Sequence, residues 1–190
     1  IRWKRANVGR EYYANWFGVS PDLDDNSPLI QNALNNMHTG DILIFDTGRF
    51  RCKQTIKLPY LTPDYEGNVG ITLQGTGKAP SHTRASVYAQ THFTYTGPSQ
   101  PVLTPFFDFR CAHRGAYRDG YQNFCGSIRN ICISGGGRNK NMVGLWLHIC
   151  EGILIESVTF LSCTYGMKIE KWCYWSKFND ILCASCYCGV

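Results

Sequence analysis

Three short apolar segments of this chain carry polar or aromatic side chains at alternating positions, a pattern that could support acid–base chemistry on a sugar polymer. In a β-strand alternate residues point to the same side of the sheet. Since the large apolar residues would face the core, we expect the remaining side chains to share an outer face. If the segments are neighbouring strands, they form a ladder of six side chains: Asp108, Arg110, Trp146, His148, Lys168 and Glu170.

The two carboxylates of this ladder, Asp108 and Glu170, are the candidate catalytic acids. Strands two positions apart in a sheet have backbones about 9–10 Å from each other. That spacing is compatible with an inverting glycosidase, whose two carboxyl groups stand about 6.5–9.5 Å apart around a water molecule. Polar residues also line the outer face of any solenoid, so a purely structural role for both carboxylates stays open.

The other four members of the ladder are the candidate substrate-binding residues: Arg110, Trp146, His148 and Lys168. The indole ring would stack on a pyranose face, and the cations would bind hydroxyl or uronate groups. In a lyase, by contrast, Lys168, Arg110 or His148 would act on the proton alpha to a carboxylate. Glu156 and Asp180 are further outward candidates without an evident partner.

The segments that would position the ladder repeat along the chain. Residues 145–163 and 167–186 align with matching positions 22 or 23 apart, and the cysteines at 150 and 163 match those at 173 and 186. Ile128, Ile131 and Ile133 precede the equivalent apolar positions of the next unit by 27 residues. A period in the twenties with short β-like runs predicts a solenoid, in which each turn stacks on the next.

Composition agrees with one β-rich domain. Charged residues make up 17% of the 190 positions and aromatic residues 14%, and there are 19 glycines, which suits strands with many turns. The net charge of +5 is spread along the chain. No basic block predicts a nucleic-acid partner, and no apolar run approaches the ~20 residues that membrane insertion requires.

The chain divides into three predicted parts. Residues 1–18 are aromatic and basic and should form a lead-in arm, and residues 19–40 should hold a helix that caps one end of the solenoid. Residues 41–190 should form the first coils. Because the repeat breaks off as another turn opens, we expect a longer solenoid that is truncated here.

The predicted helix has recognisable start and stop signals. An N-cap at Ser27 or a preceding Asp, followed by Pro28 at the first helical position, begins it, and Gly40 closes it. The acidic cluster at positions 22, 24 and 25 resembles part of a calcium loop. It lacks the glycine and the closing glutamate of such loops, which favours helix capping.

Ten cysteines could indicate disulfides or zinc. Cys183, Cys186 and Cys188 have metal-like spacing, but no second pair accompanies them, so we expect no metal site. Most of the cysteines should be small buried apolar residues. Stacked pairs at 150/173 or 163/186 would nevertheless lie within disulfide range.

Several segments in sequence order resemble a known family: Phe17–Val19, Asp22–Leu34, Gly40–Phe50, Ile71–Gly77 and His92–Gly97. Together they look like the opening of the pectate-lyase superfamily, in the branch of phage tailspikes and polysaccharide-degrading enzymes. The resemblance covers roughly residues 12–190. It implies an all-β, single-stranded, right-handed parallel β-helix (a pectin-lyase-like solenoid) with an N-terminal capping α-helix.

The resemblance implies a polysaccharide as partner and acid–base cleavage of its glycosidic bonds, by a hydrolase or a lyase, with no cofactor. The alternative is a non-enzymatic adhesin or virion fibre segment that binds glycans or acts as a rigid spacer. Either protein would work in a virion tail or at a cell surface, and tailspikes of this kind are homotrimers. The inserted loop at 112–126, with Tyr117, Arg118 and Tyr121, could line a sugar-binding groove.

Overall fold

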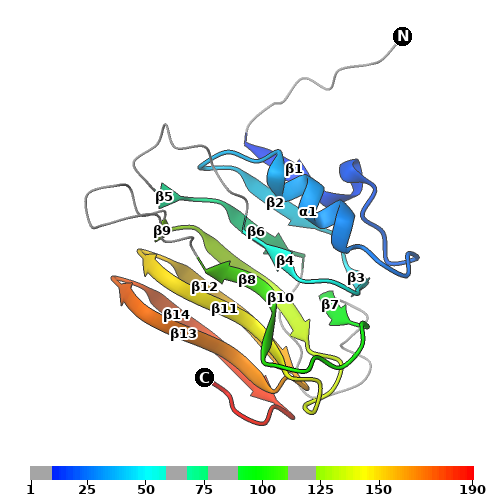
Figure 1. Ribbon diagram of the computed structural model, residues 1–190. Coiled ribbons are helices and arrows are strands. Elements are labelled where there is room, and N and C mark those ends of the chain that lie inside the picture. The colour runs from blue at the N-terminus through cyan, green and yellow to red at the C-terminus, as the bar shows by residue number, and fades with distance from the viewer. Residues whose placement is uncertain (1–9, 59–67, 77–89, 111–122) are drawn as a thin grey trace.

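The computed structural model describes residues 10–58, 68–76, 90–110 and 123–190. Strands hold 52% and helices 9% of the structure, so the chain is mostly β (Figure 1). The first elements are β1 (Glu11–Tyr13), the 3-10 helix η1 (Ala14–Phe17), α1 (Ser27–Asn35), β2 (Ile42–Phe45), β3 (Gly48–Cys52), β4 (Ile56–Lys57), β5 (Asn68–Val69) and β6 (Thr72–Gly75). The later elements are β7 (Thr91–Tyr95), β8 (Thr104–Arg110), β9 (Asn123–Phe124), β10 (Ser127–Ser134), β11 (Met142–Glu151), β12 (Leu154–Leu161), β13 (Tyr165–Tyr174) and β14 (Lys177–Ala184).

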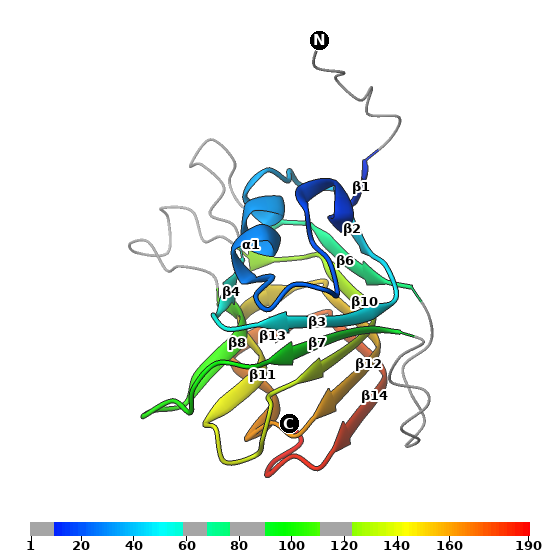
Figure 2. The same ribbon diagram turned by 90° about the vertical axis from the view of Figure 1, so that its right-hand side faces the viewer.

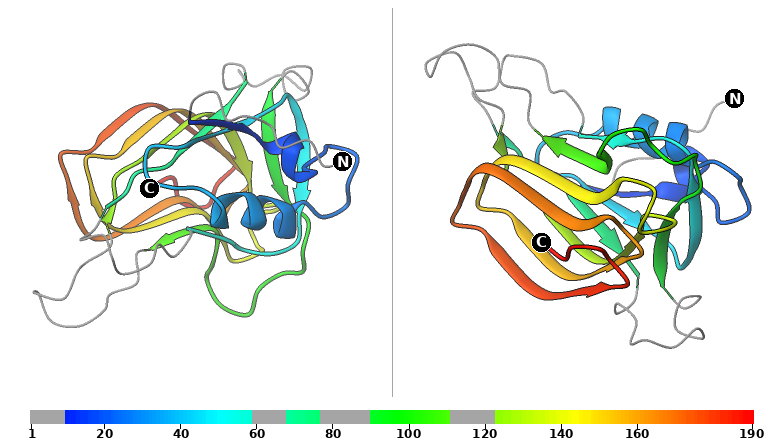
Figure 3. Two further views of the ribbon diagram at one scale, coloured as in Figure 1. Left: turned by 90° about the horizontal axis from the view of Figure 1, so that it is seen from above. Right: turned by 60° about the horizontal axis from the view of Figure 1, so that its bottom comes forward.

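These strands form two sheets, and every strand pairing in the described ranges is parallel. The first sheet has the order β1-β2-β6-β10-β12-β14, with β3 and β7 joined to its side. The second sheet contains β4, β8, β11 and β13, and β9 and β5 extend it. From β10 onward the chain alternates between the sheets. One pass through both sheets is a circuit, and each circuit stacks on the previous one (Figure 3).

A bend divides each long strand of the first sheet at the same place. Asn130, Ser157 and Asp180 lie at this bend in β10, β12 and β14, with φ of 54°, 51° and 52°. The half of β10 before the bend pairs with β6, and the half after it pairs with β7. Each circuit therefore follows three directions: two in the first sheet and one in the second.

The register confirms the sequence repeat. In the second sheet Leu145 pairs with Met167, and Cys150 pairs with Cys173. In the first sheet Val158 pairs with Ile131 on one side and with Ile181 on the other. Stacked apolar residues of successive circuits thus fill the space between the sheets, because no single circuit could bury them alone.

Aromatic rings join the two sheets in the N-terminal circuits. The ring centroids of Phe93 in the first sheet and Phe107 in the second lie 5.4 Å apart in an edge-to-face arrangement. Phe45 packs on Phe93 at 4.9 Å, and Phe109 packs on Phe124 at 5.1 Å. All five side chains are buried, and such ring pairs each contribute about 0.5–1.5 kcal/mol beyond their buried area.

Helix α1 lies at the β1–β2 end of the stack (Figures 1 and 2), and it buries Ile30, Ala33 and Leu34. A role for it as a cap remains a prediction. Its N-cap is Asn26 rather than Ser27 or an aspartate, and the helix ends at Asn35, before the turn that contains Gly40. No helix in the described ranges is long and apolar enough to cross a membrane.

Candidate functional site

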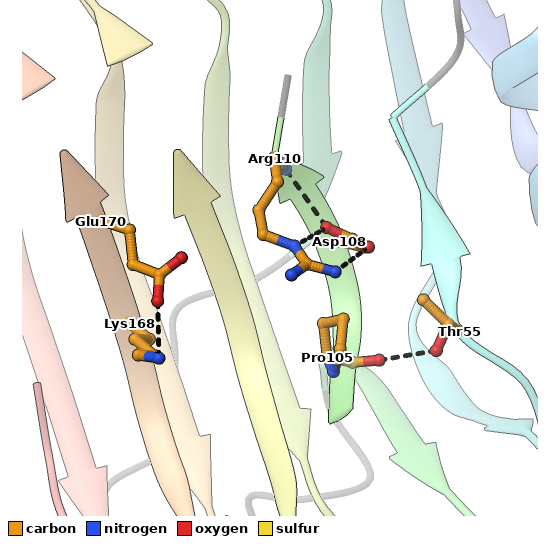
Figure 4. A network of polar contacts seen from close by, with 6 residues as sticks. All are labelled: Thr55, Pro105, Asp108, Arg110, Lys168 and Glu170. Carbon is orange, nitrogen blue, oxygen red and sulfur yellow. Dashed lines mark hydrogen bonds and ion pairs between the residues drawn. The ribbon is translucent and has the colours of Figure 1, made fainter. Parts of the chain in front are cut away.

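The six ladder residues of the sequence analysis lie together on adjacent strands of the second sheet, and Figure 4 shows four of them: Asp108, Arg110, Lys168 and Glu170. Trp146 on β11 pairs with Asp108 on β8 and with Lys168 on β13. Two residues further along, His148 pairs with Arg110 and Glu170 in the same way. The alternation of inward and outward residues thus placed all six side chains on one face.

Lys57 is a neighbour of this ladder that the sequence did not single out. It belongs to β4 and pairs with Asp108, so it extends the first row by one position. The hydroxyl of Thr55 donates to the carbonyl oxygen of Pro105 at 2.7 Å and fastens this segment to β8 (Figure 4).

Both carboxylates of the ladder are engaged in ion pairs along their own strands. Arg110 donates two side-chain hydrogen bonds to Asp108, from Nε to Oδ1 at 2.7 Å and from a terminal nitrogen to Oδ2 at 2.8 Å. This contact raises the pKa of the guanidinium further. Lys168 Nζ donates to Glu170 Oε1 at 2.7 Å (Figure 4).

The environment of Glu170 favours its ionised form. The hydrogen bond from Lys168 lowers the pKa of Glu170, and the indole N–H of Trp146 and the charges of Lys168 and His148 act in the same direction. A general acid in glycoside hydrolysis requires the opposite shift, toward a proton held near neutral pH. Glu170 in this arrangement suits a base or a hydrogen-bond acceptor.

Asp108 and Glu170 are further apart than two residues at the same level of strands β8 and β13 would be. The two residues lie two strands and also two residues apart, so their Cα atoms are about 12 Å from each other. Each carboxylate is held by a cation of its own strand. Their roles as catalytic acids remain predictions, and the inverting separation would require both side chains to leave these cations.

Trp146 is covered rather than open. Only 8% of its surface is exposed, because cations from both flanking strands lie over the ring. The Arg110 guanidinium carbon is 4.4 Å and the Lys168 nitrogen 4.0 Å from the ring centroid. The indole N–H meets no acceptor in good hydrogen-bond geometry within the described ranges, although it is close enough to Glu170 to affect that pKa.

Each cation contact of this kind contributes about 0.5–2 kcal/mol, depending on how far it is desolvated. A sugar can therefore stack on Trp146 only after Arg110 or Lys168 moves away. The substrate-binding roles of Arg110, Trp146, His148 and Lys168 remain predictions.

Two exposed aromatic residues follow the same strand and were missed in the sequence. Tyr174 ends β13, and Trp175 lies in the turn after it, with 56% and 82% of their surfaces exposed. Their ring centroids are 6.3 Å apart. Lys171 between Glu170 and Tyr174 has a left-handed backbone (φ 59°), so the strand bends there and the two residues lie at most about 13 Å apart along it. A signal for them was present in the sequence repeat. Tyr174 and Trp175 stand where the preceding circuit has Glu151 and Gly152.

The remaining predicted positions have simpler surroundings. Asp180 accepts a hydrogen bond from the Ser157 hydroxyl at 2.9 Å, and Glu156 lies opposite Arg129 and Asn179. Within the described parts of the chain, no group of three or more His, Cys, Asp or Glu residues is placed to hold a metal ion. Tyr117, Arg118 and Tyr121 lie outside the described residues.

Comparison with known proteins gives a likeness of fold. No protein-family model and no curated protein matches the chain. A solved structure of the ORF18 protein of Geobacillus virus E2 superimposes with a TM-score of 0.60 at 21% identity, over 83% of this chain. A candidate glycosyl hydrolase from Parabacteroides merdae covers 94% of the chain and 97% of its own length, but at 11% identity and a TM-score of 0.28 it supports no inference. The chain thus shares its fold with a phage protein and spans 27% of that protein's length.

Proposed function

We propose that the chain forms the first coils of a right-handed parallel β-helix of the pectin-lyase-like kind. In this proposal residues 1–18 are a lead-in arm, residues 19–40 cap the stack, and residues 41–190 form the coils. The parallel pairing, the bend repeated in each circuit and the stacked apolar positions support the proposal.

On this fold, the outer face of the second sheet binds a polysaccharide. The observation that carries this function is the exposed ring pair Tyr174 and Trp175 at the end of β13, the strand that also bears Lys168 and Glu170. Aromatic rings supply the apolar face against which a pyranose stacks, and nearby charged groups bind its hydroxyls. At most about 13 Å of β13, which bends at Lys171, separates the rings from Glu170.

The backbone of Trp175 takes the conformation of the glycine one circuit earlier. Gly152 donates its N–H to the carbonyl oxygen of Tyr174, which places Gly152 and Trp175 at equivalent turn positions. Both have positive φ, 66° for the glycine and 48° for the tryptophan. A left-handed backbone costs a residue with a side chain about 1–2 kcal/mol. Left-handed residues also mark the repeated bend at Asn130, Ser157 and Asp180, so this conformation belongs to the geometry of the circuit, and the exposed rings alone carry the proposal.

Cleavage of the bound glycan is the second candidate function. It is favoured by the two carboxylates, Asp108 and Glu170, which lie on the strands at either side of β11 and on the same face. Cleavage would require the sugar to displace Arg110 from Asp108, since both oxygens of this carboxylate accept hydrogen bonds from the guanidinium. A virion tail or a cell surface, and a homotrimeric assembly, fit either function, and the likeness to a phage protein supports the virion.

The test is binding and cleavage on one panel of acidic and neutral bacterial polysaccharides. Binding is measured by affinity electrophoresis for the wild-type chain, Trp175→Ala, Tyr174→Ala and a control, Tyr187→Ala. Tyr187 is 78% exposed but follows β14 instead of β13. We expect both β13 variants to lose at least about fivefold in affinity, taking the ~1–3 kcal/mol that a stacked nucleobase loses with its aromatic partner as the scale, while the control binds normally. Equal binding by all four proteins would overturn the assignment.

Cleavage is measured on the glycans that bind, as release of reducing ends and as absorbance at 235 nm. Reducing ends alone indicate hydrolysis and point to Asp108 and Glu170. Absorbance as well indicates elimination and points to Lys168, Arg110 and His148. Binding without either signal leaves a glycan-binding segment.

A further inference from the structure

The turns that follow β12 and β14 bring two thiols side by side. Ser162 donates its N–H to the Ala184 carbonyl oxygen at 3.0 Å, and Tyr187 donates to the carbonyl oxygen of Cys163 at 3.1 Å. These bonds make Cys163 and Cys186 opposite residues of neighbouring circuits. Opposite residues of parallel strands have Cα atoms about 4.8 Å apart, which lies inside the range of about 4.4–6.8 Å found in disulfides.

The two thiols differ in access. Cys163 is fully buried, and its Sγ contacts the carbonyl oxygen of Leu161 at 3.3 Å. Gly135 of the preceding circuit packs directly against Cys163. The two backbones are so close that a Cβ on Gly135 would lie 2.9 Å from the Cys163 Cα, which leaves no room for a reagent on that side. Cys186 is partly exposed at the rim of the core. A reagent from solvent therefore meets Cys186 first.

We propose that Cys163 and Cys186 form a thiol–disulfide exchange site for low-molecular-weight disulfides, with Cys186 as the attacking and Cys163 as the resolving thiol. The Cys186 thiolate attacks one sulfur of the disulfide, whose S–S bond breaks to release one thiolate. A mixed disulfide forms on Cys186. Cys163 then gives up its proton and attacks the Cys186 sulfur, which releases the second small thiol. The small disulfide gains two electrons and two protons, and the protein loses them.

The ionisation of the pair agrees with this order. The neighbouring Cys163 thiol lowers the pKa of Cys186. The same contact, together with burial, raises the pKa of Cys163. The exposed sulfur is thus the one that becomes a thiolate, which is the nucleophilic form of cysteine. The buried sulfur keeps its proton until the mixed disulfide has formed.

Cys150 and Cys173 provide an internal comparison. They are also opposite residues of neighbouring circuits. The Cys173 thiol, however, is directed at the Ser176 hydroxyl at 3.3 Å. Correct spacing is therefore shared by both pairs, so the 150–173 pair serves as the comparison for the rate at which the 163–186 pair is oxidised.

The test exposes the native chain, with its cysteines reduced, to oxidised glutathione at neutral pH. Samples are quenched with acid, alkylated and mapped by mass spectrometry. Cleavage after lysine separates residues 141–168 from residues 178–190, so a 163–186 disulfide joins two peptides. Fragmentation then distinguishes Cys186 from Cys183 and Cys188 in the second peptide.

We expect the 163–186 link to be the first intramolecular disulfide and to form about tenfold faster than a 150–173 link. In Cys163→Ser a glutathione adduct on Cys186 should accumulate, because no thiol resolves it. In Cys186→Ser, Cys163 should stay unmodified, and Cys173→Ser should leave the 163–186 link unchanged. First linkage at 150–173, or an adduct on Cys163 before Cys186, would overturn the proposal. The order in which disulfides form in the wild-type protein tests the proposal even if a variant does not fold.

Discussion

The Asp25 carboxylate accepts two hydrogen bonds from Ser27, one from the backbone N–H at 3.0 Å and one from the hydroxyl at 2.7 Å. The same Asp25 oxygen accepts the Lys53 N–H, and the Ser27 hydroxyl accepts the N–H groups of Lys53 and Gln54. The pair therefore caps α1 and joins the helix to the segment that follows β3. Asp25 does the capping because Asn26, at the N-cap position, uses its side chain on Ser20 and Arg51.

Asp25→Ala should lower the free energy of unfolding by about 1–2 kcal/mol, since it removes a cap and leaves the backbone N–H of Ser27 without its acceptor. Asp22→Ala is the matched control, because Asp22 is exposed and, within the described parts of the chain, its hydrogen bonds are with Ser20 alone. Urea denaturation of both variants measures the difference. An equal loss in the two would show that Asp25 has no special role in holding the helix.

Stability should fall in acid because of two carboxylates. Burial pushes the pKa of Asp25 up, but its hydrogen bonds from Ser27 and Lys53 bring the pKa below the ordinary value. The hydrogen bond from Lys168 lowers the pKa of Glu170. A folded-state pKa below the unfolded one stabilises the fold above about pH 4.5, and this contribution is lost as the pH falls through the folded value.

Thermal melts from pH 7 to pH 2 should therefore show a falling midpoint below about pH 4.5. The fall should be shallower in Asp25→Asn and Glu170→Gln than in the wild type. A wild-type slope in both variants would assign the acid sensitivity to other groups.

Replacing Trp175 should separate strain from binding. Trp175→Gly relieves a left-handed backbone and should raise the free energy of unfolding by up to about 1 kcal/mol. Trp175→Ala keeps the strain, and both variants lose the ring, so glycan affinity should drop equally in the two. Denaturation and affinity electrophoresis test this together. A Trp175→Gly protein less stable than the wild type would mean that the ring stabilises the fold.

The Arg110–Asp108 pair should contribute modestly to stability. Asp108→Asn should lower the free energy of unfolding by about 0.5–1 kcal/mol, because the pair has ideal two-bond geometry on a partly buried face. Asp24→Asn is the control, since its single 3.3 Å contact with Arg51 lies in the open. That variant should change stability by less than about 0.5 kcal/mol. Asp108→Asn should also free Arg110, so glycan affinity is measured on the same samples.

The pairing of strands could be predicted because apolar residues recur at fixed spacing. Val158 and Ile181 had to lie in the core, and a one-residue slip would have turned them outward. The same alternation placed Asp108 and Glu170 on one face. The sequence did not show that Arg110 and Lys168 cover Trp146, since long side chains choose their partners only after the strands assemble.

The turn at Trp175 was missed for a related reason. Glycine at position 152 indicates a left-handed backbone, whereas tryptophan ordinarily opposes one. Only the pairing of the two turns reveals that Trp175 adopts the glycine conformation. The N-cap is Asn26, one residue before the expected Ser27. The hydrogen bonds to Ser27 come from Asp25, the residue before the N-cap.

The bend at Asn130, Ser157 and Asp180 gives successive circuits the same backbone path, so that they are structurally equivalent. These residues are 27 and then 23 positions apart, yet they stand side by side in the stack. The longer circuit places its extra residues between β10 and β11, where they leave the pairing on either side unchanged. Evolution or a protein engineer can therefore lengthen or exchange that loop while the alignment of every strand is kept.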